Sequence, residues 1–200
     1  MTDEKPLWTA DEAMARLVAG NERFATGQSR YSSVSQEVLT ALVQGQSPFA
    51  TIIGCSDSRV PVELVFDAGL GELFTVRIAG NVFSPELMGS LQYAAVHLHT
   101  PLFVVLGHEG CGAVSAALAA LRGGPRERER IALLLERITP GLANIDASLP
   151  SEAQLSAAVE ANVRWVDHQI RETPEAQARV KEGILRLVGA VYELKTGRVR

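Results

Sequence analysis

Two short stretches of the sequence combine side chains that bind metals or carry charge. In "IIGCSDSRV", an apolar run is followed by Cys55, Asp57 and Arg59 at alternate positions. In "VVLGHEGCGAV", a second apolar run is followed by His108 and, three residues later, Cys111. Thiolate sulfur and imidazole nitrogen are ligands that zinc prefers. An aspartate and an arginine beside such ligands can form an ion pair that a metal-dependent reaction would use.

The number of available ligands restricts the kind of zinc site. The chain has only two cysteines, so a closed structural site of four cysteines is excluded. Cys55, His108 and Cys111 leave a fourth position open, which is the arrangement of catalytic zinc. The alternative is that both cysteines are small buried hydrophobic residues and that the histidine bonds a backbone carbonyl. The presence of both clusters, each after an apolar run, argues against that alternative.

The two clusters can meet only if the fold brings the ends of two strands together. Apolar and β-branched runs, typical of strands buried on both faces, alternate with segments of helical periodicity. This alternation predicts an α/β fold with a mainly parallel central β-sheet flanked by helices, in which ligands gather at the carboxyl ends of the strands. We expect strands at 49–55, 73–80, 101–108 and 183–194, and helices at 85–99, 113–123, 126–138 and 151–172.

The first 45 residues are expected to form a helical arm. Ala13, Leu17 and Phe24 share one face of a predicted helix at 10–27. A second short helix is expected at 35–46, before the break at Pro48. We predict that the apolar face of the arm packs on a partner subunit. The chain is then a single domain over 1–200, with the arm at 1–45 and an α/β zinc-binding core at 46–200.

Composition restricts the class of protein. The chain has 200 residues, 46% of them hydrophobic, which suffices for one compact domain. Its net charge is -4 and its basic residues are scattered, which argues against a nucleic-acid partner. No run approaches the roughly 20 apolar residues of a membrane span, and the acidic N-terminus does not resemble a signal peptide. Two cysteines do not indicate a secreted disulfide scaffold, so we expect a cytoplasmic protein without a membrane partner.

The sequence resembles the β-class carbonic anhydrases. "CSDSRV" is followed about fifty residues later by "GHEGCGAV", and the likeness extends to "GNERFATG", to "PVELVFDAGLGELFTVRIAGN" and to "VGAVYELKTGRV". The resemblance implies one Zn²⁺ per chain, bound by Cys55, His108 and Cys111. It also implies that Asp57 and Arg59 form the catalytic dyad of the family.

The resemblance implies an activity and a role for each residue of the dyad. The reaction is the reversible hydration of CO₂ to bicarbonate and a proton, through attack of a zinc-bound hydroxide. Asp57, held by Arg59, stays ionised and accepts a hydrogen bond from the nucleophile. In a closed form of the site, Asp57 instead becomes the fourth zinc ligand. The enzyme is then a carbonic anhydrase, a zinc lyase.

The resemblance also implies a substrate cleft built across a dimer interface. Its positions fall on Gln46, Phe74, Ala79 and Tyr93, with Gln46 donating to a substrate oxygen and the aromatic rings forming an apolar wall. Ala79 stands where other members often have valine. From the residues alone, Phe74 and Tyr93 would be assigned to the hydrophobic core. The assembly implied is a homodimer or a dimer of dimers, with CO₂ and bicarbonate as the small-molecule partners.

Two other functions remain open on the same ligands. A hydrolase of carbonyl sulfide or carbon disulfide would use an identical zinc site, and a noncatalytic zinc- or bicarbonate-binding module would not need an intact dyad. Some relatives also have an inhibitory bicarbonate pocket built from Trp, Arg and Tyr. Here Arg77 and Tyr192 match two of those positions, but Ile52 replaces the Trp, so we expect no such inhibition. His97, His99 and His168 are expected to be structural or surface residues.

Overall fold

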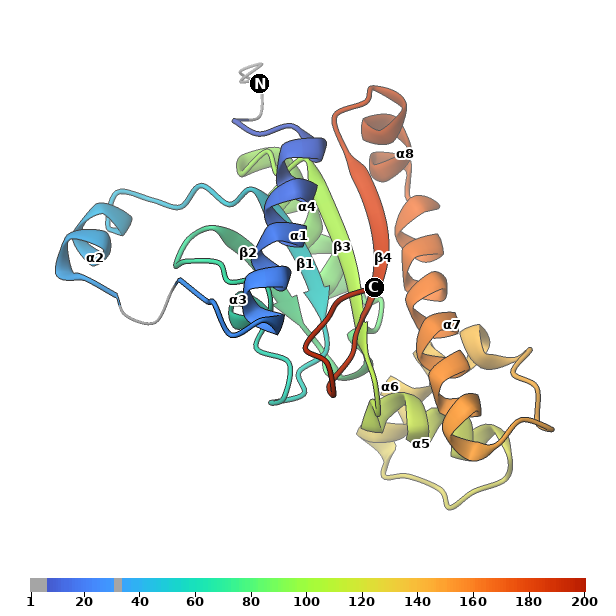
Figure 1. Ribbon diagram of the computed structural model, residues 1–200. Coiled ribbons are helices and arrows are strands. Elements are labelled where there is room, and N and C mark those ends of the chain that lie inside the picture. The colour runs from blue at the N-terminus through green and yellow to red at the C-terminus, as the bar shows by residue number, and fades with distance from the viewer. Residues whose placement is uncertain (1–6, 31–33) are drawn as a thin grey trace.

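The sheet has four strands, and all of them are parallel. The computed structural model describes residues 7–30 and 34–200, and within them the strand order is β2-β1-β3-β4 (Figure 1). This confirms the predicted α/β class with a parallel central sheet. The strands are β1 (Ala50–Gly54), β2 (Leu73–Arg77), β3 (Leu102–His108) and β4 (Arg186–Tyr192).

The two central strands are buried along their whole length. Every residue of β1 and of β3 is buried, as expected for apolar runs covered on both faces of a parallel sheet. Gly54, the last residue of β1, is in register with Leu106 of β3. The strands therefore end at the same edge of the sheet, and the residues that follow them emerge side by side.

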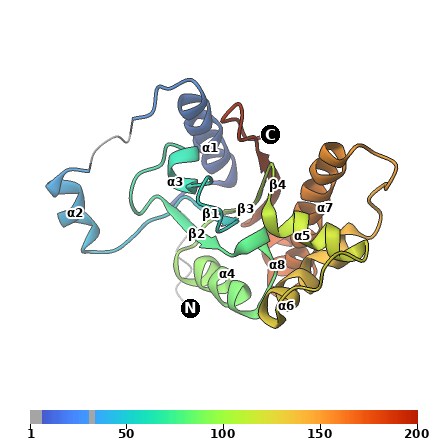
Figure 2. The same cartoon turned by 90° about the horizontal axis from the view of Figure 1, so that it is seen from below.

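Helices cover both faces of the sheet (Figure 2). One face, with Ile52 and Val104, packs against α1 and α3. The opposite face, with Ile53 and Val105, packs against the remaining helices of the core, above all α7. The helices are α1 (Ala10–Ala25), α2 (Gln36–Leu42), α3 (Val62–Val65), α4 (Pro85–His97), α5 (Gly112–Leu121), α6 (Glu129–Ile138), α7 (Ser151–Arg171) and α8 (Pro174–Lys181), with 3₁₀ turns η1 (Ala79–Asn81) and η2 (Thr139–Leu142).

Helix α1 packs on its own chain. The helix begins with a capping box between Thr9 and Glu12, so its start follows a local sequence signal. Ala13 and Leu17 are buried in the same core as β1 and β3, and the Phe24 ring lies 6.4 Å from that of Tyr192. Ala13 and Leu17 are therefore already covered by their own chain, whereas Phe24 is only half-buried, and the packing of the arm on a partner subunit stays a prediction.

The remaining elements agree with the sequence in type and differ at their ends. The predicted helix at 35–46 is shorter, since α2 ends at Leu42. The short helices α3 and α8 were not anticipated, and β4 begins at Arg186 rather than at residue 183. Within the described residues, no helix combines the length and the apolar character needed to cross a bilayer.

Candidate metal centre

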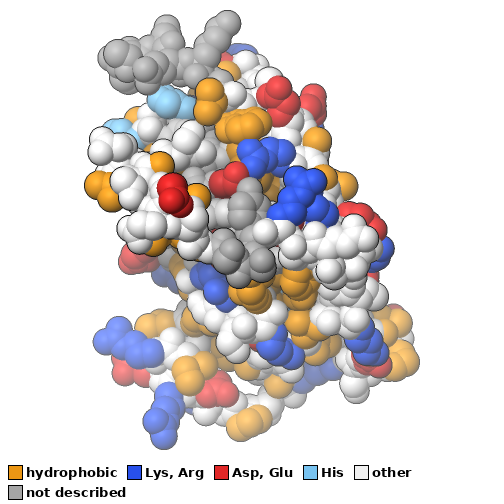
Figure 3. All heavy atoms as spheres, turned by 60° about the vertical axis from the view of Figure 1, so that its left-hand side comes forward, with side chains coloured by type: hydrophobic (Ala, Val, Ile, Leu, Met, Phe, Trp, Pro, Cys, Tyr) orange, Lys and Arg blue, Asp and Glu red, His pale blue; other side chains and the backbone are white. Residues whose placement is uncertain are grey.

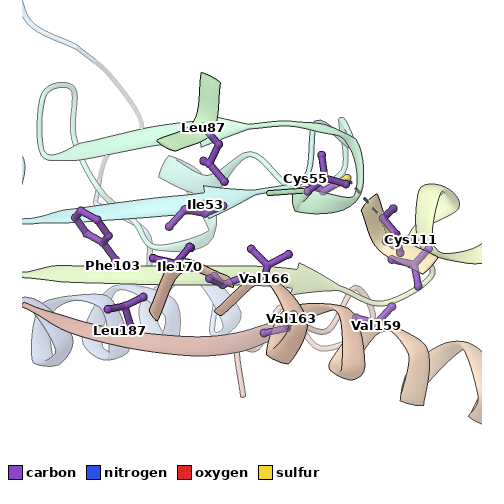
Figure 4. Close-up of a cluster of buried hydrophobic side chains, with 14 of the residues drawn as sticks. Ile53, Cys55, Leu87, Phe103, Cys111, Val159, Val163, Val166, Ile170 and Leu187 are labelled. Carbon is purple, nitrogen blue, oxygen red and sulfur yellow. Dashed lines mark hydrogen bonds between the residues drawn. The ribbon is translucent and has the colours of Figure 1, made fainter. Parts of the chain in front are cut away.

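The three predicted ligands meet at the edge of the sheet where β1 and β3 end. Cys55 directly follows β1, His108 is the last residue of β3, and Cys111 is the N-cap residue of α5. All three are buried, and their ligand atoms lie within 4.8 Å of one another. The two Sγ atoms are 4.0 Å apart and point toward each other (Figure 4). The parallel register thus unites two cysteines that are 56 positions apart in the sequence.

The imidazole of His108 is oriented as a metal ligand. Its Nδ1 lies 2.9 Å from the carbonyl oxygen of Glu109, which assigns the proton to Nδ1 and leaves the lone pair on Nε2. Nε2 is buried and has no hydrogen-bond partner among the described residues. A buried nitrogen with a free lone pair, facing two sulfur atoms, fits a zinc ligand.

The two thiols interact strongly. The hydrogen bond with Cys111 is the main cause that lowers the pKa of Cys55, although burial acts in the opposite direction. The same bond, with burial, raises the pKa of Cys111. The pair therefore shares one proton, because two thiolates this close repel each other. A divalent cation would balance both charges and allow both sulfurs to ionise, so the donor set fits Zn²⁺.

Asp57 is held beside the ligands by Arg59. Both carboxylate oxygens accept from the guanidinium, at 2.9 Å from Nε and 2.7 Å from Nη2, and Oδ1 also accepts from the Arg59 amide at 2.9 Å. The hydrogen bonds from Arg59 are the main cause that lowers the pKa of Asp57 below its ordinary value. Asp57 Oδ2 is 3.8 Å from His108 Nε2. An ionised carboxylate thus lies next to the predicted metal position while both of its oxygens engage Arg59.

Arg77 and Gly80 fix the segment that carries Cys55 and Asp57. The Arg77 side chain donates to the carbonyl of Cys55 at 2.9 Å and to that of Asp57 at 2.6 Å. The Gly80 amide donates to Cys55 Sγ at 3.2 Å. These roles were not predicted from the sequence. The glycine that ends the predicted strand at 73–80 was the available signal for a close backbone approach.

The residues matched to a bicarbonate pocket have other surroundings here. Ile52 is fully buried in the core between the sheet and α1, and Tyr192 is buried as well. Arg77 donates to the two backbone carbonyls described above. The side chain that would complete such a pocket is therefore an aliphatic core residue.

The structure brings together two of the four predicted cleft residues. The rings of Phe74 and Tyr93 stack with centroids 6.1 Å apart, and Tyr93 is 48% exposed, so it does not belong to the core as its sequence context alone suggested. Ala79 is half-buried just beyond β2. Gln46 is exposed in the segment between α2 and β1. The structure thus places Gln46 outside the buried cluster of ligands.

The other histidines lie on helices or at a helix end. The imidazole of His97 packs on the Tyr93 ring, with centroids 4.9 Å apart. His168 is exposed near Trp165, and His99 has a positive φ of 52° just after α4. All three remain assigned as structural or surface residues.

Comparison with known proteins supports the reading of the site. Residues 50–199 match the family model described as "Carbonic anhydrase". The chain is 39% identical over 190 residues to carbonic anhydrase 2 of Mycobacterium tuberculosis, covering 93% of this chain and 89% of that protein. It is 40% identical over 192 residues to a carbonic anhydrase of Mycolicibacterium smegmatis, covering 94% and 90%.

Solved structures give the same result. The β-carbonic anhydrase of Coccomyxa, in complex with acetazolamide, superposes with a TM-score of 0.75 at 27% identity, covering 94% of this chain and 85% of that one. The β-carbonic anhydrase CcaA gives a TM-score of 0.74 at 28% identity, covering 93% of both chains. With the zinc-type cluster of Cys55, His108 and Cys111 at the edge of a parallel sheet, these matches show that the chain belongs to the β-class carbonic anhydrases.

Proposed function

We propose that this protein catalyses the reversible hydration of CO₂ to bicarbonate and a proton, with one Zn²⁺ per chain. The observation that carries the proposal is the buried cluster of Cys55, His108 and Cys111, with the carboxylate of Asp57 held beside it. Zinc at this site supplies the Lewis acidity that makes water nucleophilic near neutral pH. Cys55 and Cys111 as thiolates and His108 as a neutral imidazole would hold the ion, which leaves room for one further ligand.

Asp57 and Arg59 are proposed to orient the reacting water. Because its pKa is lowered, Asp57 stays ionised and can only accept a hydrogen bond. A water that donates to Asp57 turns a lone pair toward the substrate. Arg59 keeps the carboxylate in this orientation, and its additional bond to the Gly110 carbonyl, at 3.2 Å, ties it to the loop that carries Cys111. If Arg59 released it, Asp57 would be free to take the fourth position on zinc.

Phe74, Ala79 and Tyr93 are proposed to form the apolar wall for CO₂, and Gln46 to donate to a substrate oxygen. Gln46 follows α2, which has no buried residue and stands apart from the core on the side shown in Figure 3. We propose that α2 and Gln46 lie against a second copy, as a homodimer or a dimer of dimers. The two carbonic anhydrases of Sordaria macrospora with this fold are described as tetrameric.

The proposal also includes the domain organisation, the cellular location and the binding partners of the protein. The chain acts as one domain, with the arm at 1–45 and the zinc-binding core at 46–200. It works in the cytoplasm, which agrees with two cysteines that are free rather than paired in a disulfide. Its partners are CO₂, bicarbonate and copies of itself, without nucleic acid or membrane.

A stopped-flow assay on protein of known zinc content tests the function. Zinc-loaded enzyme should hydrate CO₂ much faster than the same preparation after removal of the metal with a chelator, and restoring zinc should restore the rate. Carbonyl sulfide and carbon disulfide are assayed in parallel. Zinc-loaded protein that acts on either of these but not on CO₂ would overturn the assignment in favour of the hydrolase alternative.

A further inference from the structure

The turn η1 places a backbone amide on one of the zinc ligands. Gly80 and Asn81 both adopt the left-handed conformation, with φ of 66° and 44°. In this conformation the Gly80 amide donates to Cys55 Sγ at 3.2 Å. Two successive left-handed residues are uncommon, because a side chain is strained there, so something must hold the turn in place.

Close packing explains why position 80 is a glycine. A Cβ atom there would lie 2.6 Å from Cδ1 of Ile138 and 3.1 Å from Cβ of Ala113. The turn is therefore pressed against α5 and α6, and the amide approaches the sulfur closely because no side chain intervenes. Within the turn, the Asn81 amide also donates to the Ile78 carbonyl at 2.8 Å, so the peptide that follows Gly80 has one local restraint.

A side chain from α7 supplies a second restraint on the same peptide, at its carbonyl oxygen. Asn162 Nδ2 donates to the carbonyl oxygen of Gly80 at 2.8 Å, and Asn162 is only 1% exposed. It lies on the face of α7 that also carries Val159 and Val163, which pack into the core next to the strands (Figure 4).

The surroundings of Asn162 favour a specific role over simple packing. Its Oδ1 is buried and has no hydrogen-bond partner among the described residues. A buried polar atom without a partner is costly, and an aliphatic side chain on this face would avoid that cost. The bond to Gly80 is therefore the interaction that an asparagine provides here and that a valine or leucine would not.

We propose that Asn162 is a positioning residue for the metal centre. It holds the Gly80 carbonyl, keeps η1 in its left-handed conformation and so keeps the Gly80 amide on Cys55 Sγ. This inference rests on zinc binding in the proposed function. An N–H···S bond draws electron density away from the thiolate, so the sulfur donates less charge to zinc and the ion remains a stronger Lewis acid.

The test uses cobalt as a spectroscopic substitute for zinc. Full-length Asn162→Ala is compared with wild type and with Asn162→Ser. The serine variant differs from the alanine variant by one hydroxyl group. The control is Asn21→Ala. Asn21 is also a buried asparagine, with 6% of its surface exposed. Its side-chain amide donates to the backbone carbonyls of Val65, at 3.1 Å, and of Gly197, at 2.8 Å. Its bonds join α1 to segments away from the ligands.

In Asn162→Ala, the sulfur-to-cobalt charge-transfer absorption should move to longer wavelength, because an unbonded thiolate gives up electron density more easily. In a chelator competition, the variant should also bind zinc about tenfold more weakly than wild type, because the loss of orientation of the Cys55 sulfur outweighs its stronger electron donation. In Asn162→Ser, whose hydroxyl is one bond shorter than the amide nitrogen, the absorption should move in the same direction. Asn21→Ala should leave both readouts at the wild-type value, even where its thermal stability falls.

Two results would overturn the inference: an unchanged cobalt spectrum in Asn162→Ala, or an equal change in Asn21→Ala. If Asn162→Ala does not fold, Asn162→Ser against wild type decides, and an unshifted absorption counts against the role. The cobalt spectrum reports thiolate ligation without any turnover. A failure of the positioning role is therefore distinguishable from a failure of CO₂ hydration.

Discussion

The edge of the sheet that carries the ligands and the segment around α2 differ in how their own chain supports them. At the sheet edge, the strand register, Arg77, Gly80 and Arg59 all restrain the residues of the site. Helix α2 has only seven residues and buries none of them, and Val43 just beyond it is 81% exposed. The metal ligands and the Asp57–Arg59 pair are therefore held within one chain, whereas the segment around α2 is exposed in the single chain.

The difference follows from what each region gains by folding. Buried strands make backbone hydrogen bonds and exclude water on both faces, so residues that follow them have well-defined positions. A helix of two turns is marginal in water unless tertiary packing supports it. The apolar side chains around α2 receive little such packing from their own chain, since Val34 and Val43 are both more than half exposed. The predictions below test this contrast.

The largest effect should come from removing a thiolate. Cys55→Ala or Cys111→Ala should lower the zinc content from about one ion per chain to nearly none, because one thiolate and one imidazole cannot retain the ion. Metal analysis after dialysis measures this, and circular dichroism checks that the variants stay folded. Full zinc occupancy in both variants would show that the ligands are assigned incorrectly.

Removing Arg59 should separate binding of the metal from activity. Arg59→Ala should keep most of the zinc, since Arg59 touches Asp57 and not a ligand side chain. CO₂ hydration should fall by about 10- to 100-fold, because the freed carboxylate can occupy the fourth position. Arg59→Lys is the matched control, since it keeps the charge but loses the two-pronged bond, and it should be intermediate. Near wild-type rates in Arg59→Ala would remove the dyad from the mechanism.

The rate of CO₂ hydration should rise with pH, because of the charges on zinc and on its two thiolate ligands. Two thiolates cancel the 2+ charge of zinc, so the ion acidifies water less than it would with three neutral histidines, where the pKa is about 7. CO₂ hydration should therefore rise from pH 7 toward pH 9. Stopped-flow rates at constant ionic strength measure this, and a flat profile between pH 6 and 9 would contradict it.

Asp57 should not cause that rise. Its pKa in the folded protein is lowered, mainly by the hydrogen bonds from Arg59, so it is ionised throughout this range. The stability that the Asp57–Arg59 pair contributes is present above the ordinary carboxyl pKa of about 3.9 and is lost as the pH falls through the lowered value. Thermal stability should therefore respond to this pair only in acid, well below the pH range of the activity profile.

The sequence was most informative where local patterns decide the structure. Apolar runs fixed the strands, and residues that directly follow parallel strands necessarily share one edge of the sheet, so the grouping of Cys55, His108 and Cys111 could be predicted. Apolar periodicity likewise predicted a helix at 10–27, and α1 covers Ala10–Ala25. These features depend on neighbours in the chain or on one general property of parallel sheets.

The features that sequence reasoning missed depend on distant residues. Periodicity identified the apolar face of α1 but not the surface that covers it, and Leu17 is covered by its own sheet rather than by a partner. The bond from Asn162 to Gly80 joins residues 82 positions apart and has no local pattern. Arg77 in a strand gave no sign that its guanidinium would bond two backbone carbonyls.

The smallest effect on the folded chain should come from the α2 segment, where a change should alter assembly instead. Val43→Asp places a charge on a side chain that is 81% exposed in the single chain, so the free energy of unfolding of the isolated subunit should change by no more than about 0.5 kcal/mol. If a second copy covers this segment, burying that charge should weaken the dimer by about tenfold or more.

Val18→Asp on α1 is the control, because Val18 is also a well-exposed valine, at 63%, but lies on the helix that packs on its own sheet. Sedimentation velocity at micromolar concentrations compares the three proteins: dissociation in Val43→Asp alone supports assembly through α2, whereas equal association of all three, or dissociation only in Val18→Asp, would place the interface elsewhere.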